Sequence, residues 1–291
     1  MKVLSLTTEI KDRLRDYSAL FSRREVMTWM HGDFRGVNPK IERYDRKWIS
    51  HKEISYLDYF KYIYSFLRAG YFNEYVFKNE FLTDWLLDEL GKEDSRVFNE
   101  FRIGNNVADL VMFNGISKAF EIKTEYDSDS RLSSQIEAYQ KVFNEVYLII
   151  PDFKISDYQH CAKEVGIITF SKAKGVAFEL HRSAARNQEV KPEVVMNILH
   201  TKEYKQLVKT CFGSLPEMNS FNQYAVCFDL LKTIPNYKLN ELFISAMKQR
   251  RSDYKLKKNN HREFNQIRLS LNLSIKDESI LFQHLKSPII I

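Results

Sequence analysis

The 291-residue chain is poor in the residues that break or cross-link a fold. It contains nine glycines, six prolines and three cysteines (Cys161, Cys211 and Cys227). So little glycine and proline argues against a disordered or linker-dominated chain. The cysteines lie far apart, with no C-x-x-C pair and no histidine at ligand spacing, which argues against a disulfide framework and a cysteine-based zinc site. We therefore expect free thiols in the reducing cytoplasm.

Long apolar runs and metal-binding histidine patterns are also missing. We find no run long enough to cross a bilayer and no basic-then-apolar leader. The seven histidines show no H-x-x-x-H or H-x-H spacing, which disfavours a zinc or HNH-type centre. The sequence predicts a cytoplasmic protein with no membrane partner.

Charge is distributed unevenly along the chain. Residues 1–70 carry 14 Lys/Arg against 9 Asp/Glu, residues 71–182 carry 13 against 19, and residues 183–291 carry 17 against 10. Two basic flanks therefore surround an acidic middle, although the net charge is only +6. Basic flanks suit a polyanion such as nucleic acid, and clustered carboxylates in the middle suit cations.

The hydrophobic period changes along the chain from helical to extended and back. The first 70 residues predict aromatic-rich helices, including one with Ser55 as its N-cap and Gly70 at its end, and a second amphipathic helix follows from Asn73. Short strands then alternate with helices, and the chain beyond 183–192, the best linker candidate, reads as helical again. We predict strands at 97–103, 107–113, 117–123, 145–150, 166–170 and 176–180, with helices at 130–143 and 156–164.

This pattern predicts an α/β protein with three regions. A core at 71–182, built as helix, three-strand meander, helix and strand, lies between an N-terminal helical region at 1–70 and a basic helical region at 183–291.

The meander carries charges where apolar residues would be expected. Asp109 lies in the second strand and Glu121 and Lys123 in the third, and buried charges are costly unless they are paired or bind a metal. Alternation puts Glu121 and Lys123 on one face. A two-residue loop at Asn114-Gly115 would pair Asp109 with Phe120, whereas a loop that includes Ile116 pairs it with Glu121. We predict the longer loop.

The same reasoning adds a third acid to this face. With a two-residue Gly104-Asn105 loop, Glu100 lies opposite Asp109. Two or three carboxylates and a backbone carbonyl can hold Mg²⁺ or Mn²⁺, and a nearby lysine can orient a water and stabilise charge on a phosphate. The residues thus predict metal-assisted phosphodiester hydrolysis. The alternative is a structural ion pair at a sheet edge.

An acid in the second strand and E-x-K in the third, followed by helix and strand, resemble the PD-(D/E)xK nuclease superfamily, over about residues 72–170. The resemblance implies that Asp109, Glu121 and the carbonyl of Ile122 bind the metal and that Lys123 is catalytic. Ala108 stands where the family name has proline. The stretch is also similar to uncharacterised bacterial proteins placed in this superfamily.

Gln135 and Tyr139 on the following helix resemble the Q-x-x-x-Y element of RecB-type members, where these residues position the active site and the nucleic acid. They are equally compatible with an ordinary i, i+4 pair on a helix surface. The additional glutamate of the family is assigned to Glu100, with Glu80 on the preceding helix as the alternative.

The basic run at 248–268, with eight Lys/Arg and two acids, is a second candidate for phosphate contact, through Lys255, Lys257 and Lys258. Its alternative is a solvated helix face.

We therefore expect a metal-dependent nuclease that uses Mg²⁺ or Mn²⁺, with DNA preferred over RNA by analogy with the superfamily. The first alternative is a nucleic-acid-binding protein on a nuclease scaffold that does not cut, or cuts only with a partner. The second is a toxin, immunity or anti-phage (phage defence) component that acts mainly through protein binding. A homodimer or a protein partner is left open.

Overall fold

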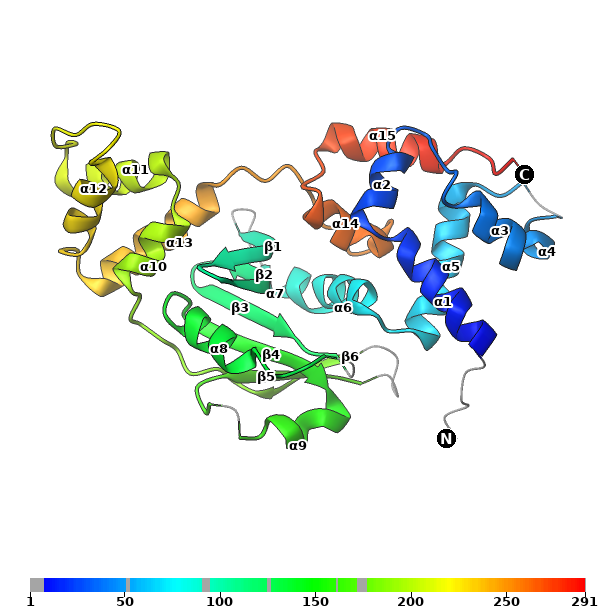
Figure 1. The fold of residues 1–291 in the computed structure, drawn as a ribbon, viewed down its shortest axis with the longest axis horizontal. Coiled ribbons are helices and arrows are strands. Elements are labelled where there is room, and N and C mark those ends of the chain that lie inside the picture. Colours follow the sequence, from blue (N-terminus) through cyan, green and yellow to red (C-terminus); the bar gives the residue numbers. More distant parts are fainter. Residues whose placement is uncertain are drawn as a thin grey trace. The chain divides into compact units, whose positions relative to one another are not determined.

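The computed structural model describes residues 8–50, 53–90, 95–124, 127–160, 162–171 and 177–290. The chain forms two compact units, which Figure 1 shows as a mainly helical unit and a unit built on a sheet. Unit 1 consists of Met1–Leu87 with Ser252–Ile291, and unit 2 consists of Asp88–Arg251. Unit 1 therefore joins the two ends of the chain, and unit 2 is inserted between them.

Unit 2 is a mixed α/β structure with one six-stranded sheet in the order β1-β2-β3-β4-β5-β6. The first three strands form an antiparallel meander, β3, β4 and β5 run parallel, and β6 is antiparallel to β5. Helix α8 (Leu132–Gln140) is the crossover from β3 to β4. The strands are β1 (Arg96–Ile103), β2 (Asn106–Phe113), β3 (Ser117–Ile122), β4 (Glu145–Pro151), β5 (Gly166–Ser171) and β6 (Ala177–Arg182).

The predicted order of strands and the crossover helix is confirmed, but the predicted helix at 156–164 is wrong. The chain there forms a 3-10 turn, η2 (Asp152–Lys154), and a single helical turn, α9 (Ile155–Tyr158). The N–H of Val165 then donates to the carbonyl of Ala162, and β5 begins at the next residue.

Strand register agrees with the loops predicted from the sequence. β2 and β3 pair from Phe113↔Ser117 to Leu110↔Phe120, so the loop includes Ile116. β1 and β2 pair through Ile103↔Asn106, so their loop has two residues. The same register, continued by one residue, places Asp109 opposite Glu121.

Four helices, α10 (Pro192–Ile198), α11 (Thr201–Phe212), α12 (Gln223–Leu231) and α13 (Asn236–Gln249), also belong to unit 2. They share one buried apolar cluster with the sheet and α8. The rings of Phe113 on β2 and Phe243 on α13 meet edge to face with centroids 5.7 Å apart. Burial of this apolar surface makes sheet and helices one structure.

The predicted linker has no regular secondary structure up to residue 191 and lies inside unit 2. The N–H groups of Asn187 and Lys191 donate to the carbonyls of Asn144 and Lys141. The three predicted regions at 1–70, 71–182 and 183–291 therefore differ from the two units, because the helices after the linker pack on the sheet rather than apart from it.

Unit 1 is helical and rich in buried aromatic residues. Its helix α5 begins after Ser55 with a capping box to Asp58 and ends at Gly70, as predicted. Its aromatic rings pack on one another in the core: the buried Trp29 and Phe60 contact each other with ring centroids 4.0 Å apart. The helices are α1 (Thr8–Leu20), α2 (Arg23–Trp29), α3 (Asn38–Tyr44), α4 (Arg46–Ile49), α5 (Tyr56–Gly70), α6 (Glu74–Phe81), the π-helical η1 (Leu82–Leu86), η3 (Arg262–Phe264), α14 (Asn265–Ser270) and α15 (Ile275–Leu285), and α7 (Leu87–Leu90) spans the boundary to unit 2.

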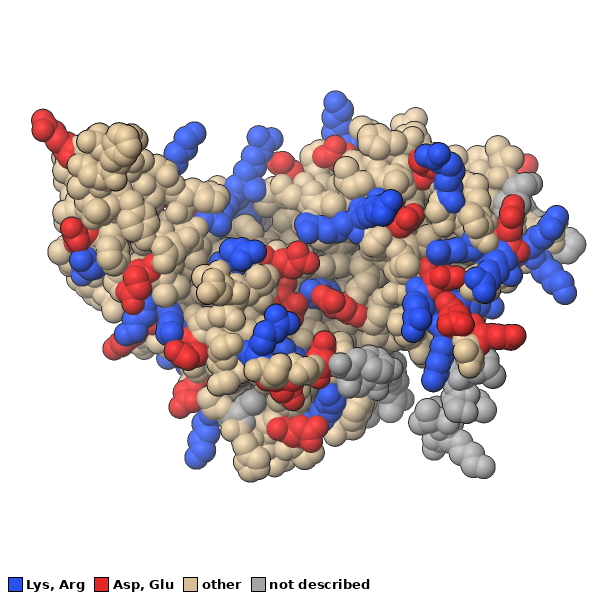
Figure 2. Space-filling view, in the orientation of Figure 1, with Lys and Arg blue, Asp and Glu red and all other residues tan. Residues whose placement is uncertain are grey.

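The visible surface carries both signs of charge. Figure 2 shows basic and acidic side chains interspersed over the face that it presents. Among the described helices, none is long and apolar enough to cross a membrane.

Candidate active site

Asp109 joins the second and third strands where their main-chain pairing ends. Beyond the Leu110↔Phe120 pair, the Asp109 carboxylate accepts a hydrogen bond from the N–H of Ile122, with Oδ2 2.9 Å from the nitrogen. A buried backbone N–H needs an acceptor, and here a side chain replaces the opposite strand. The acid is thereby held against the backbone next to Glu121.

Glu121 is buried on β3 and is held by two side chains of α8. The amide of Gln135 donates to Oε1 at 2.7 Å, and the hydroxyl of Tyr139 lies 2.8 Å from Oε2. The same hydroxyl lies 2.8 Å from the carbonyl oxygen of Val107 on β2. Gln135 and Tyr139, one helical turn apart, therefore face the sheet, and their interpretation as a helix-surface pair is wrong.

Lys123 completes the group on the same face of the third strand. Its Nζ lies 3.1 Å from Oε1 of Glu121 and 3.2 Å from Oε1 of Gln135. Its side chain is only 8% exposed, so the ammonium group is held between these two oxygens rather than by bulk water. The structure thus brings together Asp109, Glu121, Lys123, Gln135 and Tyr139.

Burial and charge set the protonation behaviour of this group. Burial, and then the neighbouring negative charge of Asp109, raise the pKa of Glu121, while Lys123 and the Tyr139 hydroxyl oppose that shift. Burial and the charge of Glu121 raise the pKa of Tyr139. Tyr139 therefore acts as a neutral hydrogen-bond donor, and Glu121 releases its proton less readily than an exposed glutamate.

The carboxylates of Asp109 and Glu121 could provide two of the oxygen ligands that a divalent cation such as Mg²⁺ needs. Asp109 and Glu121 interact electrostatically, and Mg²⁺ is commonly bound through one or two carboxylates, with water and phosphate as its other ligands. Among the described residues, no group of three His, Cys, Asp or Glu side chains is placed to hold a metal. Two carboxylates could hold such a cation only together with water or other oxygen ligands, because they do not form an all-protein cage.

The predicted third acid lies at the right register but in an unusual backbone conformation. Asn99↔Leu110 and Phe101↔Ala108 leave Glu100 opposite Asp109. Glu100 is exposed and has a φ of 52°. A left-handed residue interrupts the alternation of side chains along a strand, and strand alternation alone therefore no longer fixes the face that Glu100 occupies.

Glu80, the alternative acid, is fully buried in unit 1 and has partners there. It accepts from the hydroxyl of Tyr64 at 2.6 Å, from Arg68 at 2.8 Å and from Arg262 at 3.2 Å. Two arginines pair with its charge, and the tyrosine hydroxyl donates a further hydrogen bond, as a buried carboxylate requires. This environment stabilises the packing of α5, α6 and η3.

The basic run at 248–268 is divided among several structural roles. Arg250 pairs with Glu203, Arg262 with Asp84 and Arg268 with Glu278. The segment from 251 to 261 is not helical, so the prediction of helix throughout 183–291, and the solvated-helix alternative for Lys255, Lys257 and Lys258, are wrong. Lys255 and Lys258 are exposed on an irregular segment.

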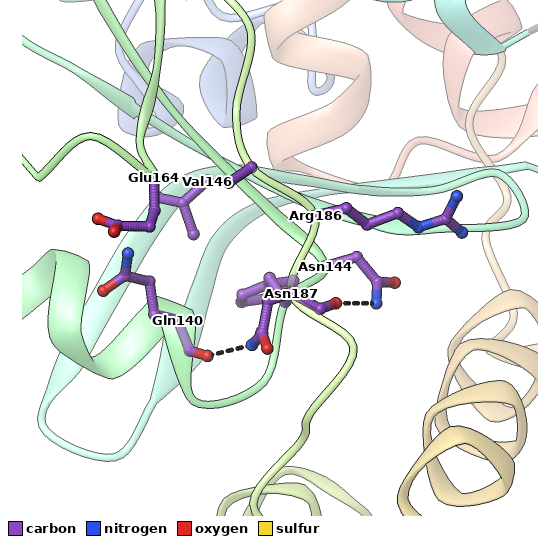
Figure 3. Close-up of a pocket in the computed structure, with 8 residues that line it drawn as sticks. Gln140, Asn144, Val146, Glu164, Arg186 and Asn187 are labelled. Atoms are coloured by element: carbon purple, nitrogen blue, oxygen red, sulfur yellow. Dashed lines mark hydrogen bonds between the residues drawn. The ribbon is translucent and has the colours of Figure 1, made fainter.

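A cavity of about 300 Å³ lies at the C-terminal end of α8 (Figure 3). Two of its side chains tie the segment after β6 to the sheet and helix. Asn144 donates to the carbonyl of Asn187 at 2.8 Å, and Asn187 in turn donates to the carbonyl of Gln140. The side chain of Asn144 also accepts from the N–H of Ser117 at 2.9 Å. We interpret the residues of this pocket as structural, because their hydrogen bonds fix the segment after β6 to the sheet and to α8.

The comparisons with known proteins concern a phage family. Residues 68–273 match the family model described as "Bacteriophage P4 protein cII". Protein cII of Enterobacteria phage P4 is 26% identical over 183 residues, which cover 58% of this chain and 64% of that protein, so the alignment spans less than two thirds of the relative. A protein of unknown function from Silicibacter pomeroyi has 13% identity and a TM-score of 0.31 over 45% of this chain and 87% of its own.

Proposed function

The chain belongs to the bacteriophage P4 protein cII family, and we propose that it is a metal-dependent nuclease with its active site at Asp109, Glu121 and Lys123. One observation carries this proposal. A lysine and two acids from neighbouring strands meet in a largely buried network, in which both carboxylate oxygens of Glu121 have hydrogen-bond partners. Burying several charged groups together lowers the stability of the fold. Groups with perturbed pKa values, such as Glu121, cluster at functional sites.

Each member of the network has a chemical role in the proposal. Asp109 and Glu121 would hold Mg²⁺ or Mn²⁺ together with the carbonyl oxygen of Ile122. When bound, the cation would neutralise charge on the phosphate and lower the pKa of a coordinated water. Because Asp109 is fixed by the N–H of Ile122, its carboxylate is already oriented, and little conformational entropy is lost when it binds.

Lys123 would orient the attacking water and stabilise charge that develops on the phosphate. Gln135 contacts both Lys123 and Glu121, so it would hold the ammonium group at a fixed position relative to the acid. The hydroxyl of Tyr139 would hold the other carboxylate oxygen of Glu121, Oε2. Glu100 is the candidate for an assisting acid, because the strand register places it opposite Asp109.

The fold supports the proposal by analogy. The sheet has an antiparallel meander, a crossover helix and then a parallel strand, and under the proposal these elements would correspond to a restriction-endonuclease-like core, with Asp109 and Glu121 as its acids. DNA is the proposed substrate, because enzymes with this core mostly cut DNA. The basic side chains at Lys255, Lys257 and Lys258 would add phosphate contacts.

The test is direct hydrolysis by the purified chain. Linear, closed circular and single-stranded DNA, and RNA, are each incubated with Mg²⁺, Mn²⁺ or EDTA. Cleavage with either metal and none in EDTA is the expected result, and the substrate panel separates endonuclease from exonuclease action. Retained binding without cleavage of any substrate would favour the non-cutting or partner-dependent alternative.

A further inference from the structure

Helix α12 is apolar on the side that faces solvent as well as on the side that faces the core of unit 2. Its core side is anchored by the buried Cys227 and Leu231. Asp229 is the one charged residue in its sequence, QYAVCFDLL. A helix that is apolar all round is normally buried on all sides. The outer side of α12 therefore lacks the polar residues expected of a surface in contact with water.

The outer face of α12 consists of four apolar residues at the spacing i, i+3, i+4 and i+7, namely Phe221, Tyr224, Ala225 and Phe228. Phe221 continues the face, because the N–H of Gln223 already donates to the carbonyl of Asn219 in a helical turn. Phe221 is 97% exposed and Tyr224 is 43% exposed. Ala225 is also exposed, and Phe228 is half-buried. The rings of Tyr224 and Phe228 have centroids 6.2 Å apart.

The charges beside this face cancel each other. Asp229 and Lys232 form an ion pair at 2.7 Å, and the ammonium group of Lys232 lies 4.7 Å from the ring centroid of Phe228. In Figure 2 the end of unit 2 that carries α12 shows mainly uncharged side chains. The face therefore has no net charge with which to select a polyanion, and two copies of it do not repel each other.

We propose that two copies of the chain associate through this face, with their α12 helices antiparallel about a twofold axis. Apolar residues at i, i+3, i+4 and i+7 are the anchors by which a helix binds a helix or a groove. A twofold dimer, the commonest homo-oligomer, requires a self-complementary face. An axis between residues 224 and 225 places Phe221 opposite Phe228 of the second copy. It also places Tyr224 opposite Ala225, so a large ring meets a small side chain and the helices can approach closely.

The exposed area suits the centre of a modest interface. Aromatic side chains bury about 150–250 Å² each, so the exposed parts of Phe221, Tyr224 and Phe228 offer roughly 300 Å² of apolar surface. Patches of about this size mark interaction sites. A standard interface takes about 800 Å² from each partner, so the rings would form its apolar centre and the polar residues around them its rim. The inference stands apart from the proposed function, because it uses no residue of the candidate active site.

The experiment measures the mass of the full chain in solution. Sedimentation equilibrium is recorded over about a hundredfold range of concentration, for the parent, for Phe221→Asp and for Phe153→Asp. Phe153 is the matched control, because it is an exposed phenylalanine (64%) elsewhere in unit 2. Phe221 is almost fully exposed, so its replacement should leave folding unchanged, which thermal melting checks. Raised salt weakens association between the acidic and basic regions of the chain but not association through apolar surface.

A disulfide tests the antiparallel arrangement. Ala225→Cys is oxidised in a chain whose Cys161 and Cys211 are replaced by serine, and a non-reducing gel shows whether two chains are joined. Ala69→Cys, at an exposed alanine of helix α5, is the matched control. Because Ala225 lies next to the proposed axis, its cysteine variant should form the covalent dimer and the control should stay monomeric.

We expect a concentration-dependent dimer of the parent that persists at raised salt. Phe221→Asp should weaken dimerisation at least about 30-fold, because the residue lies at the centre of the interface and occurs twice in it, whereas Phe153→Asp should dimerise as the parent does. A parent chain that is monomeric throughout, a dimer that dissociates on raising the salt, or equal dimerisation of the two phenylalanine variants would overturn the inference. So would equal cross-linking of Ala225→Cys and Ala69→Cys.

Discussion

Asp109 on the second strand accepts a hydrogen bond from the backbone of Ile122 on the third, with 2.9 Å between Oδ2 and the nitrogen. This contact replaces a main-chain bond of the sheet and fixes an acid next to Glu121. The two carboxylates therefore lie near each other, and the carboxylate of Glu121 is contacted by Lys123 and by two side chains of α8, Gln135 and Tyr139. The predictions below test what each member contributes.

Lys123→Ala should lower the rate of phosphodiester hydrolysis by about 10²-fold or more, because the ammonium group would stabilise charge in the transition state. Nucleic-acid affinity should stay nearly unchanged, since one lysine is a small part of the basic surface. Lys141→Ala removes an exposed lysine that pairs with Glu137 and serves as the control. Hydrolysis by Lys123→Ala at the parental rate would show that the lysine is structural.

Asp109→Asn should weaken Mg²⁺ and Mn²⁺ binding, because it removes a negative charge while keeping an acceptor for the Ile122 N–H. Calorimetric titration with Mn²⁺ measures the effect. Asp157→Asn changes an exposed acid of α9 and should bind Mn²⁺ as the parent does. Equal Mn²⁺ affinities for the two variants would remove Asp109 from the metal site.

Tyr139→Phe should lower the free energy of unfolding by about 1–2 kcal/mol, because Glu121 and the carbonyl of Val107 lose the hydroxyl between them. Urea denaturation measures this loss. A positioning role also predicts a lower kcat with little change in KM, whereas a purely structural role predicts the loss of stability alone.

Stability should depend on pH through Glu121. Burial and the negative charge of Asp109 raise its pKa above the ordinary value of a glutamate, so the folded state binds this proton more tightly than the unfolded state. The free energy of unfolding should therefore fall as the pH rises from about 4.5 through the folded-state pKa. Glu121→Gln removes this contribution, and in EDTA its stability relative to the parent should increase over that range. A difference that is independent of pH would contradict the assignment.

Neutralising Lys255, Lys257 and Lys258 together should weaken binding to all DNA sequences alike. The salt dependence on duplex DNA should flatten by roughly 0.9 per lost phosphate contact, while cleavage at saturating substrate should persist. Neutralising Lys11, Lys47 and Lys276, three exposed lysines of the same unit, is the charge-matched control. If both triple variants give the parental slope, the basic run is not a binding surface.

Local patterns were sufficient to predict the meander and the face of the acids. Alternation of apolar residues places Glu121 and Lys123 together, and only the loop through Ile116 brings Asp109 to the same face. Those features depend on near neighbours in the sequence. The sequence also pointed to Gln135 and Tyr139, but their contact with Glu121 depends on how α8 lies on the sheet.

Long-range contacts decided what the sequence did not predict. The segment at 251–261 lacks glycine and proline, so nothing local forbids a helix there. The buried side chain of Asn265 binds both the N–H and the carbonyl of Lys257, at 2.8 and 2.7 Å, and its amide reaches Thr83 at 3.0 Å. These hydrogen bonds replace those that a helix would form at Lys257, and they connect the C-terminal part of unit 1 to its N-terminal part at Thr83. The left-handed backbone of Glu100 has no sequence signal either.

The central claim, that Asp109, Glu121 and Lys123 form a metal-dependent active site, is tested most directly by one comparison of rates. Cleavage of DNA is measured under single-turnover conditions, with Mn²⁺ or EDTA, for the parent chain and for Asp109→Asn, Glu121→Gln and Lys123→Ala. The account predicts cleavage by the parent only with metal and a loss of at least about 10²-fold in each variant. Parental rates in all three variants, or undiminished cleavage in EDTA, would contradict it.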